Sequence, residues 1–460
     1  MCEIKGSSWQ QRYSASEIFT LRCKVLDKPG KLAEVCHFLG EANINIGQIN
    51  QIGVDDDHKI RDITIFFTGR DLIAKLHKLA DNIRGFEIIK ITDDILEMHR
   101  RGSIEMVSRV PITSLTDMRM LYTLGVATVC KEIEANPEKA WEYTGICDRV
   151  AIVTDGTAVL GLGDIGILPS LPVMEGKAAI FAEFANISGV PILVDSKDPD
   201  TIVETVVRIA KGFGAIQLED ISAPTCFEVE DKLKKRLNIP VFHDDQHGTA
   251  TVMLAALINA LKYTNRKAED CTIIMLGAGA AGLAISRMLL SYGIKDIVIF
   301  DSKGALCRGR EDMNPYKKKL AEITNKENFD GTLKDGFIGR DIFIGVSRPN
   351  MVSKEMIASM AKGPIVFPLS NPVGEISKEE AYEAGAAIAA DGRDINNALA
   401  YPGIFRGALD VRATDITLEM KVASSKMLAS LASEGDLLPD MLDKQVHLKN
   451  AKAVAEAWKS

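Results

Sequence analysis

The chain has 460 residues, of which 46% are hydrophobic and 26% charged, a composition that is ordinary for a soluble globular protein of about two to four domains. Its net charge of −8, the lack of an apolar run of about 20 residues and the lack of a secretory signal argue against nucleic-acid binding and membrane association. The eight cysteines are scattered without a CxxC pair, which predicts reduced thiols in a cytoplasmic protein.

A small separate domain is predicted at 18–95, after an N-terminal tail at 1–17. Alternating and helical periodicities follow one another in the order βαββαβ, which is the ferredoxin-like unit. The expected elements are a strand at 17–26, a helix at 31–42, strands at 43–54 and 59–67, a helix at 71–83 and a strand at 86–91.

This segment resembles an ACT domain. The resemblance rests on "VLDKPGKLAEVCHFLGEANINIGQI" at 25–49, in which a strand, a Pro-Gly turn, a helix and a second strand follow one another. It implies a regulatory domain that binds a small effector, such as an amino acid, near Gly30. The alternative is a domain that only dimerises or packs.

A different pattern begins near residue 109, where apolar strand-like runs alternate with helical patterns. Such alternation predicts an α/β fold, with a parallel sheet covered by helices. The pattern restarts at 271, which predicts a second, Rossmann-type domain. The expected organisation is a parallel-sheet catalytic domain at 96–250, a dinucleotide-binding domain at 251–430 and a helical tail at 431–460.

The hexapeptide "GAGAAG" follows the apolar strand "CTIIML" and opens a helix. Gly277 permits a tight turn, Gly279 lets the backbone approach a pyrophosphate, and Gly282 lets the helix pack closely on the strand. The free N–H groups of the helix N-terminus suit the phosphates. The predicted loop comprises Gly277, Ala278, Gly279, Ala280, Ala281 and Gly282.

The next strand, "DIVIF", ends at Asp301. An acidic residue at this position accepts hydrogen bonds from the adenosine ribose, which favours NAD. Lys303, Arg308 and Arg310 follow closely and are able to receive a 2′-phosphate, so NADP stays open.

Two strands upstream end in carboxylate pairs, Glu219-Asp220 and Asp244-Asp245. Because parallel strands present their carboxyl ends at one sheet edge, these acids are expected to meet, and a divalent cation would relieve their repulsion. Oxygen ligands favour Mg²⁺ or Mn²⁺ over zinc. His243 and His247 are four residues apart. We expect the chain to turn after Asp245, however, so both imidazoles are interpreted as structural hydrogen-bonding groups rather than ligands.

Four further residues have both an ordinary and a chemical interpretation. Lys177 in "LPVMEGKA" is a surface residue or, beside a bound cation, a base with a lowered pKa. Tyr122 in "MLYTLGVA" is a core residue or an acid. Asn371 in "PLSNP" and Asn397 in "NNALAYPG" belong to ordinary turns or contact a polar substrate beside the nicotinamide.

Eight motifs together resemble the compact bacterial form of malic enzymes over about 105–430. They are, in order, "YTLGVA", "VTDGTAVLGLGDIG", "LPVMEGKA", "QLEDI", "VFHDDQHGTA", "LGAGAAG", "LSNP" and "NNALAYPGIFRGAL". The resemblance implies metal-dependent oxidative decarboxylation of malate to pyruvate and CO₂, with reduction of NAD or NADP, by a homo-oligomer (a dimer or larger).

The resemblance also implies roles for individual residues. Lys177 would take the C2 hydroxyl proton, assisted by Asp244, and Tyr122 would protonate the enol intermediate. Asn371, within the dinucleotide site, and Asn397 would contact the substrate, the latter in preference to Asn396. The divalent cation, Mg²⁺ or Mn²⁺, would be held by Glu219, Asp220 and Asp245.

Two departures and two alternatives accompany this hypothesis. Leu124 stands where the family usually has proline, which is expected to loosen the turn that aims Tyr122. Ala158 stands where the larger enzymes have a carboxylate-binding arginine. The alternatives are a malolactic or oxaloacetate-decarboxylating enzyme without net redox, and an effector-binding regulator whose catalysis has decayed.

Overall fold

The computed structural model describes residues 17–67, 73, 76–77, 80, 82–122, 124–159 and 161–459. The chain divides into two compact units, Met1–Ser103 and Ile104–Ser460. Each has its own hydrophobic core, and each is described by itself below.

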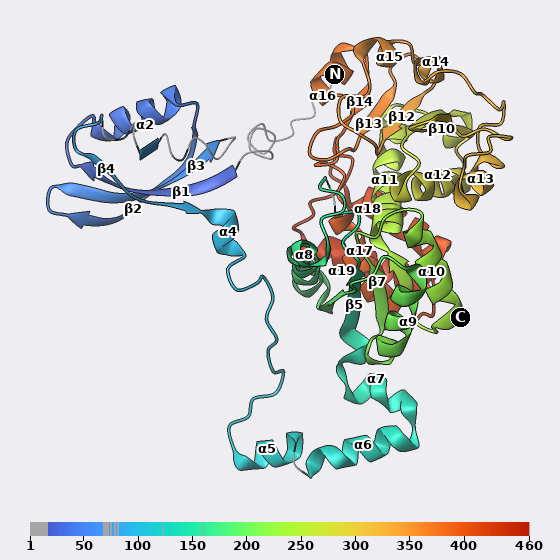
Figure 1. Ribbon diagram of the computed structural model, residues 1–460, viewed down its shortest axis with the longest axis horizontal. Coiled ribbons are helices and arrows are strands. Elements are labelled where there is room, and N and C mark those ends of the chain that lie inside the picture. Colours follow the sequence, from blue (N-terminus) through green and yellow to red (C-terminus); the bar gives the residue numbers. More distant parts are fainter. Residues whose placement is uncertain are drawn as a thin grey trace. The chain divides into compact units, whose positions relative to one another are not determined.

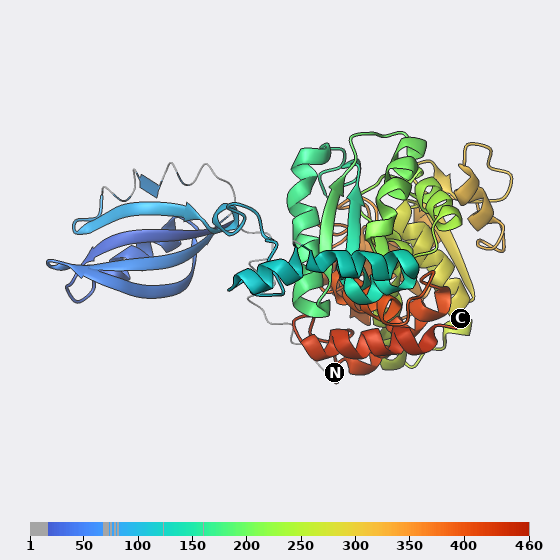
Figure 2. The same ribbon diagram turned by 90° about the horizontal axis from the view of Figure 1, so that it is seen from below.

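The first unit contains a four-stranded antiparallel sheet in the order β2-β3-β1-β4, with helix α2 covering one face (Figures 1 and 2). In β1 every second residue is buried, as one face of a half-buried strand requires. Gly30 is the N-cap of α2 and has φ of 89°, a conformation that glycine adopts without a Cβ penalty. The elements are β1 (Glu17–Leu26), α2 (Lys31–Glu41), β2 (Asn45–Asp55), β3 (His58–Phe67), β4 (Phe86–Asp93) and α4 (Asp94–Met98).

The predicted tail at 1–17 lies outside the described residues except for Glu17, and so does most of the helix predicted at 71–83. Leu76 and Ala80, from that range, are buried in the core of the unit together with Leu21 and Val35. The four predicted strands are present in the expected order.

The second unit begins with three short α-helices and then forms a parallel sheet in the order β6-β5-β7-β8. Strand β5 is buried along nearly its whole length, which is typical of a parallel strand covered on both faces. The elements are α5 (Leu115–Leu121), α6 (Gly125–Ala135), α7 (Ala140–Tyr143), β5 (Arg149–Thr154), α8 (Ile167–Ala185), β6 (Ser188–Leu193), α9 (Pro199–Ile209), β7 (Ala215–Leu218), α10 (Thr225–Arg236) and β8 (Val241–His243).

A second sheet in this unit has the order β11-β10-β9-β12-β13-β14, parallel except for the edge strand β11. The chain leaves β9 toward β10 on one side and later returns to β12 on the other, so the strand order reverses at β9, where doubly wound sheets bind ligands. The elements are β9 (Thr272–Leu276), α12 (Ala280–Tyr292), β10 (Asp296–Asp301), β11 (Gly304–Ala305), α13 (Pro315–Ala321), α14 (Leu333–Phe337), β12 (Ile342–Gly345), α15 (Lys354–Ala358), β13 (Ile365–Pro368), α16 (Lys378–Glu383) and β14 (Ile388–Ala389).

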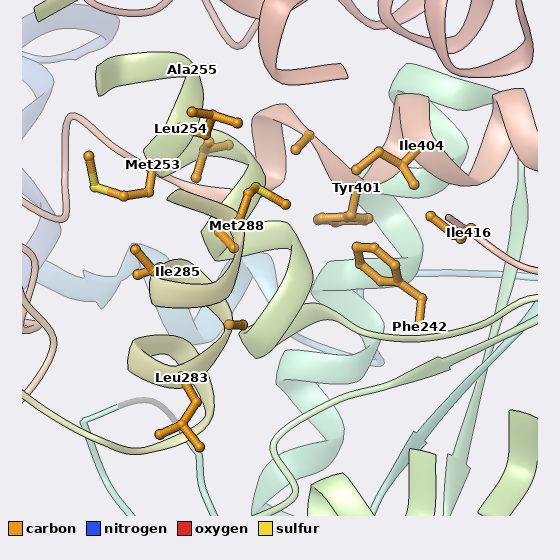
Figure 3. Close-up of a cluster of buried hydrophobic side chains, with 14 of the residues drawn as sticks. Phe242, Met253, Leu254, Ala255, Leu283, Ile285, Met288, Tyr401, Ile404 and Ile416 are labelled. Carbon is orange, nitrogen blue, oxygen red and sulfur yellow. The ribbon is translucent and has the colours of Figure 1, made fainter. Parts of the chain in front are cut away.

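Four helices complete the core of the unit: α11 (Asp244–Tyr263), α17 (Tyr401–Asp410), α18 (Leu418–Leu431) and α19 (Lys444–Ala457). Helix α11 is buried on nearly every side, and α19 packs on α17 and α18. The predicted C-terminal tail is therefore an integral layer of this unit. Figure 3 shows part of the shared core, in which Tyr401 of α17 lies near Phe242 of β8. None of the described helices is long and apolar enough to cross a membrane.

Candidate active site

Three carboxylates converge at the ends of two adjacent strands. Glu219 and Asp220 follow β7, while Asp245 lies in the first turn of α11, directly after β8. One oxygen from each lies within 4.8 Å of the others. The backbone N–H of Asp220 donates to Oδ2 of Asp245 at 3.0 Å, whereas Oδ2 of Asp220 is buried without a hydrogen-bond partner. The predicted meeting of acids at one sheet edge is therefore present.

The electrostatics of this cluster favour a cation. Burial, followed by the charge of Asp245, raises the pKa of Asp220 to about 8. Burial likewise raises the pKa of Glu219 well above its ordinary value. A divalent ion would neutralise these carboxylates and satisfy the orphaned oxygen of Asp220, and an all-oxygen set suits Mg²⁺ or Mn²⁺. The residues present fit such an ion.

Lys177 projects from the middle of α8 toward this cluster. Its Nζ lies 2.5 Å from Oδ2 of Asp244 and 3.1 Å from Oε1 of Glu219, and it donates to Oδ1 of Asn397 at 3.5 Å. Burial alone lowers the pKa of Lys177, but the facing charges of Asp244 and Glu219 outweigh burial and hold the pKa well above its ordinary value. The lowered pKa expected from the sequence applies to Lys177 beside a bound cation, and it stays a prediction.

A cavity of about 880 Å³ joins these groups to the second sheet. Its wall includes Lys177 and the three carboxylates, together with the helix-opening residues Gly279, Ala280 and Ala281 of the glycine-rich loop. Two of the predicted asparagines, Asn371 and Asn397, also line it, as does Ala158. Among the described lining residues Lys177 is the one cation. The volume of about 880 Å³ is large enough for a small diacid beside one end of a dinucleotide, and Lys177 is the lining group that carries positive charge.

The glycine-rich loop fits a pyrophosphate. A Cβ at Gly282 would lie 1.9 Å from the carbonyl oxygen of Gly277, and one at Gly277 would lie 2.5 Å from the carbonyl oxygen of Val346. Around Gly279 there is open space instead, with no atom within 4 Å of an added Cβ. Gly277 and Gly282 thus allow close packing of the chain, and Gly279 leaves room for a pyrophosphate to approach the protein backbone.

Asp301 ends β10 as predicted but is already engaged. Its Oδ2 accepts hydrogen bonds from Arg310 at 2.6 Å and Lys317 at 2.7 Å, and its Oδ1 accepts one from the N–H of Lys303 at 2.9 Å. Burial raises the pKa of this carboxyl, but Arg310 and Lys317 outweigh burial and lower the pKa to about 2. The carboxylate is therefore ionised and held in place.

The two neighbouring asparagines differ in their contacts. Asn396 uses its side-chain oxygen to cap the following turn, accepting from the N–H of Ala398 at 2.9 Å. Asn397 directs its oxygen toward Lys177. Both asparagines line the cavity, but of the two only Asn397 has a described side-chain hydrogen bond with Lys177.

The histidine environment differs from the expectation in two ways. Helix α11 begins at Asp244, so the predicted turn after Asp245 is wrong, and His247 lies within the helix while His243 is its N-cap. His247 forms structural hydrogen bonds, with Nε2 2.8 Å from Glu230 and Nδ1 3.3 Å from Lys421. His243 forms no hydrogen bond through its buried ring nitrogens, and its Nε2 lies 3.4 Å from Oδ2 of Asp245.

Tyr122 is not among the residues that line the cavity. It follows α5, and 72% of its surface is exposed. Leu124 has φ of 74°, a value that the proline ring excludes. The family's usual proline would not tolerate this backbone. Within the described part of the second unit, Tyr122 and Lys177 therefore lie in different surroundings.

Two neighbours of the cavity were not predicted. Tyr401 places its ring against Lys177. It belongs to the same "NNALAYPG" motif as Asn397, and this shared motif is the sequence feature that could have pointed to Tyr401 as a neighbour of the site. Met441, from the predicted tail, lines the cavity. Nothing in the local sequence around Met441 indicates this, because its position depends on the packing of α19 against α17.

Comparisons with known proteins agree with this geometry. Residues 101–234 match the family described as malic enzyme, N-terminal domain, and residues 246–457 match malic enzyme, NAD binding domain. The NAD-dependent malic enzyme of Geobacillus stearothermophilus is 44% identical over 92% of this chain and 91% of its own length. The bifunctional malic/malolactic enzyme of Bacillus subtilis (strain 168) is 48% identical over 80% of this chain and 93% of its own.

Among solved structures, that of the NAD-dependent malic enzyme from Thermotoga maritima is similar. It is 42% identical, has a TM-score of 0.76, and aligns over 78% of this chain and 98% of its own.

Proposed function

The chain belongs to the malic enzyme family, and we propose how its residues divide the work of oxidising and decarboxylating malate with NAD(P). One observation carries the assignment of roles. Lys177 lies within 3.1 Å of both Asp244 and Glu219, in a cavity shared with the glycine-rich loop.

Glu219, Asp220 and Asp245 would hold Mg²⁺ or Mn²⁺. When bound, the cation supplies polarisation of the C2 oxygen of malate and of the enolate that follows loss of CO₂, and the nicotinamide accepts the hydride from C2.

Lys177 takes the proton of the C2 hydroxyl. It must be neutral to do so, and with the cluster free the charges of Glu219 and Asp244 keep it protonated. A cation held by the cluster would offset the charge of Glu219 and so favour the neutral amine of Lys177, which Asp244 orients by accepting its hydrogen bond. Asn397 and Asn371 orient the polar ends of the substrate.

We infer that Tyr122 protonates C3 from a second copy of the chain. The segment that carries it exposes apolar side chains that a soluble monomer would bury, with Met106 97% and Leu124 83% exposed. Helix α5 is nevertheless well defined, since Ser114 and Asp117 form a capping box. A homodimer in which this segment covers the partner's cavity explains both the apolar surface and the exposed acid.

NAD is the proposed cofactor rather than NADP. The cations that the sequence offered to a 2′-phosphate are engaged: Arg310 by Asp301, Lys303 by Asp312, and Arg308 by the carbonyl of Lys326. A 2′-phosphate would also meet the ionised Asp301. Asp301→Ser should therefore lower kcat/KM for NAD and raise it for NADP. Unchanged cofactor preference would contradict this assignment.

For the first unit we propose an ACT-like regulatory role, with a small effector such as an amino acid bound near Gly30. The βαβ order and the left-handed turn at Gly30 support it. Titrating amino acids while measuring turnover tests the regulatory role.

We also propose a cytoplasmic location, since all the described cysteines are free thiols.

The direct test is an assay of purified protein with malate, Mn²⁺ and either NAD or NADP. Absorbance at 340 nm should rise in step with pyruvate. Lactate without reduced cofactor would instead establish the malolactic reaction, which the name of one relative includes. No product of either kind would contradict the assignment.

A further inference from the structure

Tyr401 is a buried aromatic residue that none of the assigned roles uses. It is the first residue of α17, its side chain is fully buried, and its ring centroid lies 4.7 Å from Nζ of Lys177. Its hydroxyl donates to the backbone carbonyl of Lys177 at 3.3 Å. The residue thus touches Lys177 at both ends, at the amine through the ring and at the main chain through the hydroxyl.

We propose that Tyr401 is a positioning residue for Lys177, in that its ring face fixes the amine at the reacting position. This inference rests on the proposed role of Lys177 as the base. The ring face carries negative quadrupole charge and attracts an ammonium within about 6 Å of the centroid. The N–H groups of a neutral amine also contact a ring face favourably. The ring therefore holds Nζ before and after proton transfer.

The other partners of Lys177 do not share this property. Glu219 belongs to the candidate metal cluster and Asp244 is an anion, so the contact of each with Nζ depends on charges that change during turnover. Asn397 lies 3.5 Å away and is expected to turn toward the substrate. The ring of Tyr401 is uncharged, and no contact with the metal or the substrate is proposed for it.

The surroundings of Tyr401 keep the ring rigid. Its ring meets the ring of Phe181 edge to face, with centroids 4.9 Å apart and an interplanar angle of 85°, and Phe181 lies one turn beyond Lys177 on the same face of α8. Asn450 of α19 donates to the carbonyl of Ala400 at 3.2 Å, which fixes the start of α17. A Cβ at Gly403 would lie 2.6 Å from the side-chain amide nitrogen of Asn450, so α17 and α19 approach closely. The C-terminal helix thus anchors the element that carries Tyr401.

The same cluster offers a matched control. Phe405 lies one turn after Tyr401 on α17 and is also fully buried. Its ring also meets that of Phe181 edge to face, with centroids 5.2 Å apart and an interplanar angle of 89°, but no contact with Lys177 is found for it in the described structure. Phe405→Leu and Tyr401→Leu therefore remove a ring from the same core, and only the second removes the ring beside Nζ.

The test measures turnover, binding and thermal stability for Tyr401→Leu, Tyr401→Phe and Phe405→Leu. We expect Tyr401→Leu to lower kcat for malate oxidation about tenfold, while KM for malate and the Kd of NADH from its fluorescence change less than about twofold. Tyr401→Phe keeps the ring and should recover most of that turnover. Phe405→Leu should lower Tm about as much as Tyr401→Leu but keep kcat.

Two results would overturn the proposal. One is an equal loss of kcat in Phe405→Leu and Tyr401→Leu, which would make the effect one of core packing. The other is undiminished kcat in Tyr401→Leu. A further variant separates this proposal from the role of Lys177: in a Lys177→Ala background, adding Tyr401→Leu should leave the residual rate unchanged. If Lys177→Ala alone retains normal kcat, the proposed base is wrong, independently of Tyr401.

Discussion

The cavity end of α8 and the segment 106–126 each carry a residue that is expected to move a proton, yet their surroundings are opposite. Lys177 is nearly buried and touches two carboxylates, an amide and an aromatic ring. Tyr122 is mostly exposed and follows a helix whose apolar side chains face solvent. The proposed base, whose pKa must be controlled, is nearly buried among groups of its own chain at the cavity wall. The acid that we propose a second copy delivers would need only a defined helix and an apolar surface to dock.

The largest expected effect lies in the carboxylate cluster. Asp245→Ala removes one of the three acids that would hold the cation, and it should abolish metal-dependent turnover. His243→Asn, two residues away, should cost much less, because the imidazole is not among the three converging ligand groups, although its Nε2 lies 3.4 Å from Oδ2 of Asp245. Steady-state assays over a range of Mn²⁺ concentrations check both variants. Similar losses in the two would place His243 among the ligands.

Lys177→Ala should lower kcat by about 10²–10⁴, the usual range for loss of a positioned base. Dinucleotide binding should persist, because the glycine-rich loop lies on the other sheet. Measuring the Kd of NADH by its fluorescence together with kcat separates a loss of turnover from a loss of dinucleotide binding. Near-normal turnover would remove Lys177 from its role.

The affinity for Mn²⁺ should rise with pH between about 6 and 8. With the cluster free, the pKa of Asp220 is about 8, well above its ordinary value of 3.8, so a bound cation must displace a proton below that pH. Affinity should then change about tenfold per pH unit for each proton displaced. By the same linkage the folded metal-free protein holds a proton that the unfolded chain has lost, so its stability falls as pH rises through this window.

Calorimetric titration in buffers of different ionisation enthalpy checks this coupling, since it counts the protons released on Mn²⁺ binding. A pH-independent Kd with no proton release would show that Asp220 is ionised without the metal.

The smallest effect is expected in the exposed segment. Leu115→Ser should weaken association of the copies, so that activity per chain falls several-fold on dilution and recovers at high concentration. Leu115 is 79% exposed, and Ile338, 63% exposed at the C-terminal end of α14, gives a matched control as Ile338→Ser. Sedimentation velocity of each variant, measured at the same concentrations as its activity, checks this prediction. Loss of activity without a change in mass would contradict a docking role for the segment.

The sequence predicted what depends on local pattern. The strand-loop-helix at "GAGAAG", the acids after two strands and the parallel sheets follow from periodicity and from where strands end, and all are present. The contacts of Tyr401 and Met441 with the site could not be predicted, because they depend on how α17 and α19 pack. The start of α11 at Asp244 was missed because two acids and a glycine resemble a turn, although acids suit a helix N-terminus. The solvent exposure of Tyr122 also has no local signal.

Complementation between two inactive variants tests the central claim, that Tyr122 of one copy serves Lys177 of another. Tyr122→Phe and Lys177→Ala should each be nearly inactive alone. If the acid acts across the interface, a mixed dimer contains one site with both intact residues. Mixing the two variants under conditions that exchange subunits should then restore roughly a quarter of wild-type activity, since about half of the dimers are mixed and each has one working site. If both residues act within one chain, every site in the mixture lacks one of them, and no activity should return.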